Sequence, residues 1–184
     1  MPSLPSVAVR FRALIVGAIC LLAVMPPVQA GDGQADADQV KAAFIISFLK
    51  FVEWPTRGPR PAATTVAVVG DEAFGAVLQR AAAGQSHNGH AIDVRVAARA
   101  GEAADAQLLF IGSSQVRNLA AILRETEGRP VLTIGDTDGF GQAGVILNLY
   151  TFDQRVRIEA NTTAAARAGL RLSSQLLRLA RIVG

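Results

Sequence analysis

The residues that most resemble a chemical motif are the glycine-rich stretch 139–144, with the sequence GFGQAG. Its spacing matches the G-x-G-x-x-G loop that binds dinucleotides. In that site the loop opens a helix whose N-terminus faces the pyrophosphate. Here the stretch is followed by residues 145–150 (VILNLY), whose composition is typical of a strand. We therefore interpret the glycines as a connection before a strand and predict no nucleotide cofactor.

Two other groups suggest metal binding. Asp136 and Asp138 have the spacing that opens a calcium loop, but Leu147 stands at position 12, where an EF-hand needs a glutamate. His87 and His90 are the only histidines, and no cysteine follows residue 20. A zinc site normally needs three or four protein ligands. The sequence therefore predicts no metal site.

The chain also lacks the patterns of a hydrolase. No Gly-x-Ser-x-Gly elbow occurs, and a Ser-His-Asp triad would have to use one of the two turn histidines. We predict a protein that is not an enzyme.

Alternating helix and strand patterns predict an α/β fold. Apolar runs bounded by turn residues predict strands, and apolar residues at helical spacing predict the helices between them. The predicted strands are residues 64–69, 92–96, 108–111 and 131–134, and the predicted helices are residues 40–52, 74–83 and 113–127. Ser113 or Ser114 can cap the last of these helices. Residues 31–38 are polar and predict a loose N-terminus.

After residue 134 the pattern changes. Residues 144–150 and 155–160 predict two strands joined by a short turn, which is the spacing of an antiparallel hairpin. Asn161 or one of the two threonines after it then caps a long C-terminal helix. We predict one α/β domain, residues 31–184, with a mixed sheet, an antiparallel C-terminal hairpin and flanking helices.

Two predicted helices could form interaction surfaces. Phe44, Phe48 and Phe51 share one face of a helix that is too apolar to be solvated all round, so it packs on the core and could also meet a partner. The C-terminal helix would carry four arginines on one arc. A solvated basic face is our main interpretation of this arc, with a docking surface for an acidic partner or a membrane as the alternative. The arginines are Arg167, Arg171, Arg178 and Arg181.

The predicted strand 155–160 presents charge on one face. Arg155, Arg157 and Glu159 alternate with apolar residues, and alternate residues of a strand point to the same side. Such a face could orient a partner. Alternatively, Arg157 and Glu159 pair with each other on a solvated sheet surface, where a pair contributes under about 1 kcal/mol.

The first thirty residues have the order of a cleaved signal peptide. Arg10 and Arg12 precede an apolar run, residues 13–24, that is too short to span a bilayer, and small residues before position 31 suit a cleavage site. Cleavage after Ala30 removes two of the 18 basic residues and none of the 15 acidic ones, so the mature net charge is +1. This balance does not favour nucleic-acid binding. The mature chain has no cysteine.

Taken together, these segments resemble the YfiR-like family of periplasmic proteins. The resemblance rests on the order and spacing of VKAAF at 40–44, FVEWP at 51–55, GD and FG within 70–75, NG at 88–89, VLTI at 131–134, GF at 139–140, RVRIE at 155–159 and AGLRLSSQ at 168–175.

The resemblance implies a regulatory role. Proteins of this family repress an inner-membrane diguanylate cyclase through its periplasmic sensor domain, which lowers cyclic di-GMP signalling and restrains biofilm formation. It further implies a homodimer and an outer-membrane lipoprotein that sequesters the repressor. Phe140, Arg157 and Glu159 are our candidate partner-binding residues. A periplasmic small-molecule sensor is the alternative function. Family members can carry disulfides, which the mature chain cannot form, so redox control is in question.

Overall fold

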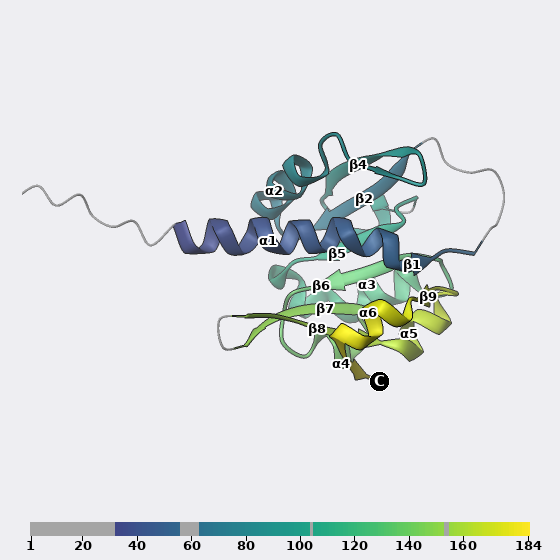
Figure 1. Ribbon diagram of the computed structural model, residues 1–184. Coiled ribbons are helices and arrows are strands. Elements are labelled where there is room, and N and C mark those ends of the chain that lie inside the picture. The colour runs from purple at the N-terminus through teal and green to yellow at the C-terminus, as the bar shows by residue number, and fades with distance from the viewer. Residues whose placement is uncertain (1–31, 56–62, 104, 153–154) are drawn as a thin grey trace, which may run out of the picture. The chain divides into compact units, whose positions relative to one another are not determined.

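A mixed sheet of eight strands frames the protein (Figure 1). The computed structural model describes residues 32–55, 63–103, 105–152 and 155–184, so the predicted signal peptide lies outside the described residues. The strand order is β10-β8-β7-β6-β5-β2-β4-β3. The bounds are β2 (Thr64–Val69), β3 (Ser86–His87), β4 (His90–Ala97), β5 (Leu108–Ile111), β6 (Leu132–Gly135), β7 (Leu147–Phe152), β8 (Arg155–Asn161) and β10 (Ala180–Val183).

The central strands β4, β2, β5, β6 and β7 are parallel, and β10 is parallel to β8. Strands β7 and β8 form the predicted antiparallel hairpin, from Leu147 opposite Ala160 to Phe152 opposite Arg155. A short antiparallel pair, β1 (Val52–Glu53) with β9 (Arg171–Leu172), lies apart from the main sheet. The predicted fold class, an α/β domain with a mixed sheet, is confirmed.

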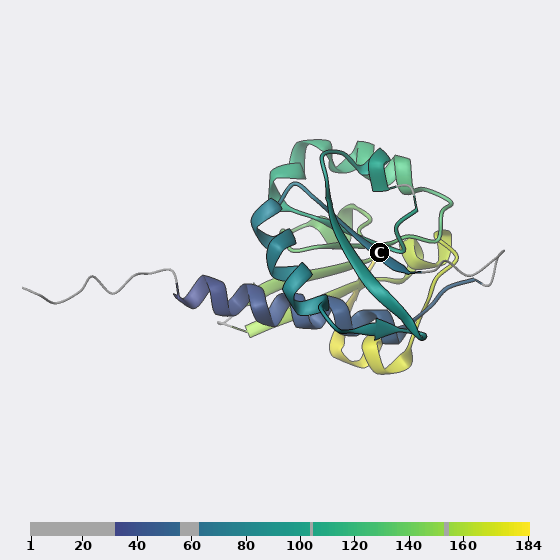
Figure 2. The ribbon, with the colours of Figure 1, turned by 90° about the horizontal axis from the view of Figure 1, so that it is seen from above.

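Helices cover both faces of the sheet (Figures 1 and 2). Helices α1 (Asp32–Phe48), α2 (Glu72–Ala82) and α6 (Ser174–Leu179) lie on one face, and α5 (Thr162–Arg167) adds to the same core. The other face carries a 3-10 turn, Ala100–Ala103, with α3 (Leu119–Thr126) and α4 (Phe140–Ala143). On this second face, the part of the sheet that β7 and β8 form beyond α4 is not covered by an apolar core among the described residues.

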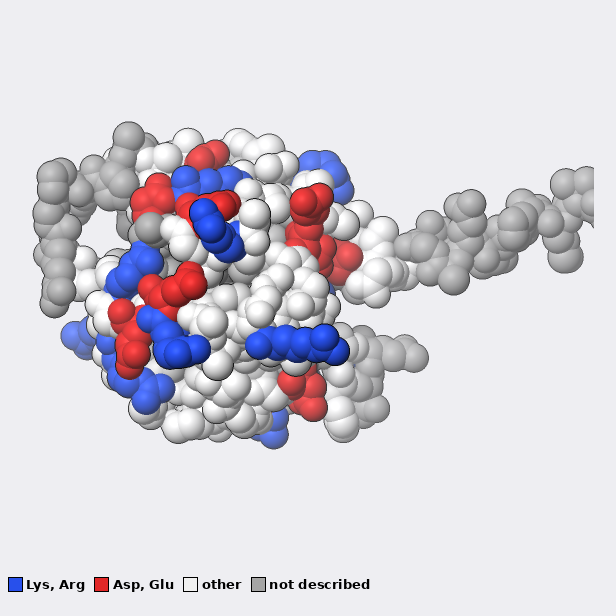
Figure 3. Space-filling model, turned by 180° about the vertical axis from the view of Figure 1, so that it is seen from behind, with Lys and Arg blue, Asp and Glu red and all other residues white. Residues whose placement is uncertain are grey.

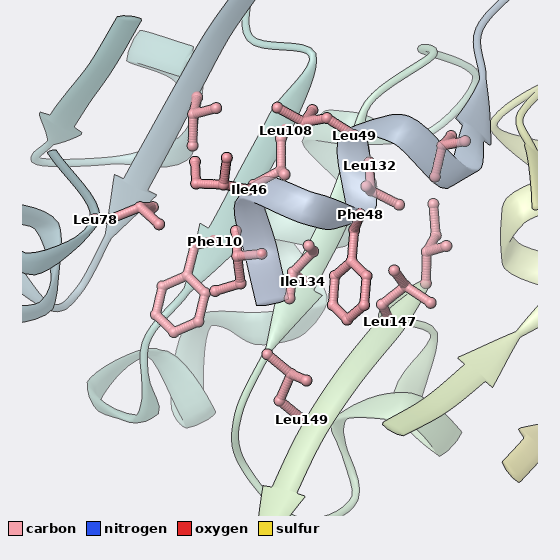
Figure 4. Close-up of a cluster of buried hydrophobic side chains, with 14 of the residues drawn as sticks. Ile46, Phe48, Leu49, Leu78, Leu108, Phe110, Leu132, Ile134, Leu147 and Leu149 are labelled. Carbon is pink, nitrogen blue, oxygen red and sulfur yellow. The ribbon is translucent and has the colours of Figure 1, made fainter. Parts of the chain in front are cut away.

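The larger core lies beneath α1. Figure 4 shows Ile46, Phe48 and Leu49 directed onto leucine, isoleucine and phenylalanine side chains of β5, β6 and β7. Phe48 and Leu49 are each at most 2% exposed, whereas Phe44, one turn earlier, is 37% exposed. The apolar helix predicted over residues 40–52 is confirmed as a core element, but α1 ends at Phe48 and the chain continues as a 3-10 turn, Leu49–Phe51, and then as β1. No helix among the described residues is long and apolar enough to cross a membrane.

The N-terminal boundary differs from the prediction. Residues 32–38 are helical rather than loose, and the exposed first turns of α1 are rich in aspartate. Acidic side chains near a helix N-terminus are stabilised by the helix dipole. Gln34 also donates a hydrogen bond to the Asp38 carboxylate at 3.0 Å. Polarity here therefore reflects a solvated helix end, not a missing helix.

The predicted long C-terminal helix is wrong. Gly169 has a φ of +70° and follows α5, and Leu172 then pairs with Val52 in β9 and β1. The Ser173 hydroxyl accepts a hydrogen bond from the Leu176 amide at 3.3 Å and caps the new helix α6. The last residues form β10, so the four arginines do not share one helical face.

The predicted serine cap of the helix after β5 is also wrong. Gly112 is the residue before the 3-10 turn Ser113–Asn118, and no side chain caps that turn. Ser114 instead donates to the Gly70 carbonyl at 2.7 Å and ties together the ends of β2 and β5. A Cβ on Gly112 would stand 2.8 Å from that carbonyl oxygen. The loops after β2 and β5 are thus tied together at the carboxyl ends of these strands, where the strand order reverses. Open α/β sheets usually bind their ligands in a crevice at this place.

Candidate partner-binding face

Arginines and aromatic rings gather on one face of the β7–β8 hairpin. Residues directly opposite each other in a strand pair point to the same side of the sheet. Tyr150 lies opposite Arg157, Phe152 opposite Arg155, and Arg181 of β10 opposite Glu159. We call Tyr150, Phe152, Arg155, Arg157 and Arg181 the hairpin face.

The hairpin face is open to solvent. Phe152 is 60% exposed, the side chain of Arg181 is 57% exposed, and Arg155 and Arg157 are exposed. Tyr150 is half-buried, and the Arg181 guanidinium carbon lies 5.5 Å from the centre of its ring. A cation over an aromatic face is attracted by the ring quadrupole. The stacked pair therefore forms an ordered part of this face.

Glu159 anchors the hairpin face from within. The residue is only 1% exposed, and its carboxylate contacts Arg181. It also accepts hydrogen bonds from Asn148 at 3.0 Å and from Gln142 at 3.3 Å. The hydrogen bond to Glu159 raises the pKa of the Arg181 guanidinium above its usual range. A buried carboxylate needs such partners because it has lost its hydration.

The glycine-rich stretch packs against this carboxylate. It forms α4, a helix of one turn between the parallel strands β6 and β7. A Cβ on Gly141 would lie 2.6 Å from Glu159 Oε2 and 3.1 Å from a Val183 methyl group. Asn161 donates to the Gly141 carbonyl at 2.9 Å and accepts from the Ala164 amide at 2.8 Å, which caps α5. The missing side chain at Gly141 thus lets α4 press onto Glu159 and β10.

The structure separates the three candidate residues. Arg157 is exposed on the hairpin face, as the alternation of its strand predicted. Glu159 points to the same side but is buried, so it neither presents charge to solvent nor pairs with Arg157, the two alternatives drawn from the sequence. Phe140 is 2% exposed in the core beneath α4, where its ring lies against Gly135. Of the three candidates, only Arg157 is therefore exposed.

The sequence did not reveal Arg181, Tyr150 and Phe152 as members of the face. The sequence pattern places Arg181 in the long C-terminal helix, and this wrong prediction gives no sign that Arg181 has neighbours in a sheet. Tyr150 and Phe152 alternate with Leu149 along β7 and could have been paired with the arginines of β8 once the hairpin register was known.

The candidate metal residues lie apart. Asp136 forms an ion pair with Lys41 of α1 at 2.7 Å, and Lys41 also reaches Asp38 at 3.5 Å. Burial would lower the pKa of Lys41, but the hydrogen bond and charge of Asp136, with Asp38, outweigh it and raise that pKa. His87 packs edge-on to Trp54, with ring centres 5.6 Å apart. Within the described residues no group of three or more His, Cys, Asp or Glu side chains could hold a metal ion.

The hairpin face has the chemistry of a protein-binding surface. Arginine and tyrosine are enriched among the residues that dominate binding energy at protein interfaces. Arg155 and Arg157 favour an acidic partner, because complementary charge steers and orients association, whereas the charge of Arg181 is already paired with Glu159. Figure 3 shows basic and acidic side chains interspersed over the side of the molecule opposite to that in Figure 1. On that side of the molecule, such mixing differs from the dense basic surface that nucleic acid requires.

Comparison with known proteins gives a family and a fold. The protein family described as YfiR/HmsC-like matches residues 38–181. None of the curated proteins matches the chain. A solved "conserved domain protein" from Vibrio cholerae O1 biovar El Tor is similar in structure, with a TM-score of 0.56 and 12% identity, over 80% of this chain and 60% of that one.

A second similar structure is that of the "ABC domain in complex with L-Trp" from Streptococcus pneumonia. Its TM-score is 0.53 and its identity 9%, over 78% of this chain and 60% of that one. The present chain therefore spans about 60% of the length of either structure. At such identities the likeness shows a shared fold.

Proposed function

The chain belongs to the YfiR/HmsC-like family, and from this membership we propose that it binds and represses the periplasmic sensor domain of an inner-membrane diguanylate cyclase. At family level the role is regulation of cyclic di-GMP signalling in the periplasm, and the family is not one of enzymes. Repression would lower cyclic di-GMP in the cell. The chain would act by binding alone, without catalysis.

The observation that supports this proposal is the hairpin face. Arg155 and Arg157 stand side by side with Phe152 and Tyr150 on a strand pair whose position is fixed by the sheet. Glu159 and Arg181 hold the neighbouring strand β10 in place. A rigid surface loses little conformational freedom on binding, so more of its contact energy appears as affinity.

Deletion and complementation test the proposal. Deleting the gene should raise cellular cyclic di-GMP, and the wild-type gene should restore the normal level. The double substitution Arg155→Glu/Arg157→Glu should fail to restore it, because it reverses the charge of two exposed side chains without touching the core. Arg117→Glu is the matched control, since Arg117 is an exposed arginine of the 3-10 turn before α3, and it should restore repression.

One outcome would contradict repression of a cyclase, and another would contradict the hairpin face as the interface. An unchanged cyclic di-GMP level after deletion, with no cyclase recovered when the tagged protein is captured from detergent-solubilised cells, would contradict the proposal. Equal restoration by the Arg155→Glu/Arg157→Glu and Arg117→Glu variants, at equal protein levels on an immunoblot, would move the interface away from the hairpin face.

An outer-membrane lipoprotein that sequesters the repressor, and a homodimeric state, complete the proposed circuit. The same capture experiment identifies the lipoprotein, and light scattering of the purified protein measures its mass. Both partners follow from the family-level role rather than from a contact of the described residues.

A small-molecule sensor is the second candidate function. Between α3, α4 and α5 lies a hollow of about 250 Å³ with Arg124 and Arg167 at its rim. This is slightly below the usual range of about 300–1,000 Å³ for ligand pockets. A metabolite that binds there would raise the melting temperature, because a ligand at a hundredfold excess over its dissociation constant adds about 2.7 kcal/mol of stability. A thermal-shift screen that yields a saturable ligand would favour this function.

A further inference from the structure

Strand β4 leaves most of one edge of the main sheet without a neighbour. Strand β3 pairs with β4 only at Ala91 and His90, and β2 lies on its other side from Ile92 to Ala97. Among the described strands none covers the outer edge of residues 93–97. An edge of this kind is a ready template for another strand.

The direction of the free backbone groups can be read from two hydrogen bonds. The Ile92 amide donates to the Gln85 carbonyl at 3.4 Å, away from β2. The carbonyl of Val94 accepts from the side-chain amide of Gln79 at 3.2 Å, on the same side. Backbone groups of alternate strand residues point the same way. The amides of Val94 and Val96 therefore also face the outer edge.

Gln79 takes the place of a missing strand. Its amide group lies on α2, and it donates to the strand carbonyl that a neighbouring backbone amide would otherwise reach. The contact satisfies one carbonyl without covering the edge. Val96 remains 40% exposed beside it.

A groove runs between this edge and the end of α2. The hollow measures about 480 Å³. It is lined by Gln79, Ala82 and Ala83 of α2 and the residue after it, by Ser86 of β3, and by Ala91 and Asp93 of β4. The alanines leave space for a larger apolar side chain. Asp93 is the only charged residue in the lining, and it is exposed.

From this arrangement we propose that the free edge of β4 binds an extended peptide segment of a partner protein as an added strand, with apolar and basic residues alternating along the segment. Backbone hydrogen bonds to Val94 and Val96 supply affinity, as in other cases of strand addition. An apolar side chain of the segment fills the alanine-lined groove, and a basic side chain meets Asp93. The surface is distinct from the basic hairpin face, which would repel such a peptide.

Amide hydrogen exchange followed by NMR on the whole protein tests the proposal. The probe is a short acetylated and amidated peptide of alternating lysine and valine, and a peptide of alternating glutamate and valine is its control. In the free protein the amide of Val96, a residue 40% exposed, should exchange fast, and that of Val94, a residue 8% exposed, should exchange at a slower but measurable rate. The lysine-valine peptide should slow both by roughly tenfold or more, because exchange needs an open hydrogen bond. The control peptide should not.

Substitutions of the edge make the test specific. Val96→Pro removes one outward amide and leaves the bonds to β2, since proline is tolerated where the amide faces away from the sheet. It should abolish the effect, and Val96→Thr, which keeps the amide, should preserve it. Asp93→Lys should reverse the preference between the two peptides.

Equal binding by Val96→Pro and Val96→Thr would overturn the proposal, as would slow exchange at Val96 before any peptide is added. Exchange of the Ala67 amide in β2 reports whether each variant is folded, and Val96→Thr and Asp93→Lys keep the test valid if the proline variant is not. Peptide-induced changes confined to the hairpin face would equally overturn it.

Discussion

At the scale of single residues, the partial burial of His87 makes stability depend on pH. Burial lowers the pKa of His87 below its usual 6.5. A hydrogen bond to the backbone of Leu49 acts to raise this pKa, and the charge of His90 acts to lower it further. The folded protein therefore binds fewer protons near this pH than the unfolded chain does. Stability is fully present above pH 6.5 and is lost as the pH falls through that value toward the lower folded pKa.

Urea unfolding at a series of pH values checks this effect. We expect the free energy of unfolding of the wild type to fall more steeply between neutral and mildly acidic pH than that of His87→Gln. His90→Gln is the comparison and should keep most of the steeper slope, because burial, the largest cause of the lowered His87 pKa, is unchanged. Because Trp54 is the only tryptophan, its fluorescence reports the same transition. Parallel slopes in the wild type and His87→Gln would contradict the assignment.

The buried carboxylate of Glu159 gives a second prediction at this scale. Arg181→Met leaves a nearly inaccessible charge with only its two amide partners, Asn148 and Gln142. We expect a measurable loss of stability, because the buried carboxylate loses its cationic partner. Adding Glu159→Gln should recover part of this loss, since a neutral amide needs no cation. Denaturant unfolding of Arg181→Met, Glu159→Gln and the double variant measures the coupling between the two side chains. Strictly additive effects on the free energy of unfolding would show that they do not interact.

At the scale of elements, α4 depends on the absence of a side chain at Gly141. Gly141→Ala places a methyl group against Glu159 and Val183. We expect a loss of roughly 1–3 kcal/mol, as for overpacking in other cores. Gly33→Ala is the control, because a Cβ there meets nothing within 4 Å, and it should be neutral or slightly stabilising. Equal melting temperatures for both variants would mean that Glu159 moves aside freely.

The elements also show how far local sequence patterns reach. Strands β2 and β5 match the predicted residue ranges, because buried runs bounded by glycine or serine have few other solutions. The prediction of one long C-terminal helix failed because Leu172, which is half-buried against the core, pairs as a strand residue with Val52 from a distant part of the chain. Helical spacing of arginines and leucines in that segment was coincidental.

The candidate site was predictable only in part for the same reason. Alternation along the β8 strand correctly placed Arg157 and Glu159 on one side. Their different burial depends on α4 and β10, which lie against Glu159 but not against Arg157. No periodicity within the strand could separate an exposed arginine from a buried glutamate two residues later.

At the scale of the whole molecule, the proposed association with the cyclase should depend on salt. Arginines at the rim of an interface chiefly accelerate encounter, and salt screens them beyond about 8 Å at physiological ionic strength. The association rate with the purified sensor domain should therefore fall as salt rises. Arg155→Glu/Arg157→Glu should remove most of this dependence, and Arg117→Glu should retain it. Surface plasmon resonance measures both rates, and a salt-independent wild type would argue against steering by the hairpin face.

The pairing of β1 with β9 bears on how the protein reaches its final state. Val52 and Leu172 are partners although 120 positions separate them, and β10 adds to β8 only through residues 180–183. Contacts between distant positions form late and slowly, because a long loop must close first. A chain delivered N-terminus first would therefore stay open until its final strand arrived. For the export that we propose from the first thirty residues, such late closure would keep the chain extended while it crosses the membrane.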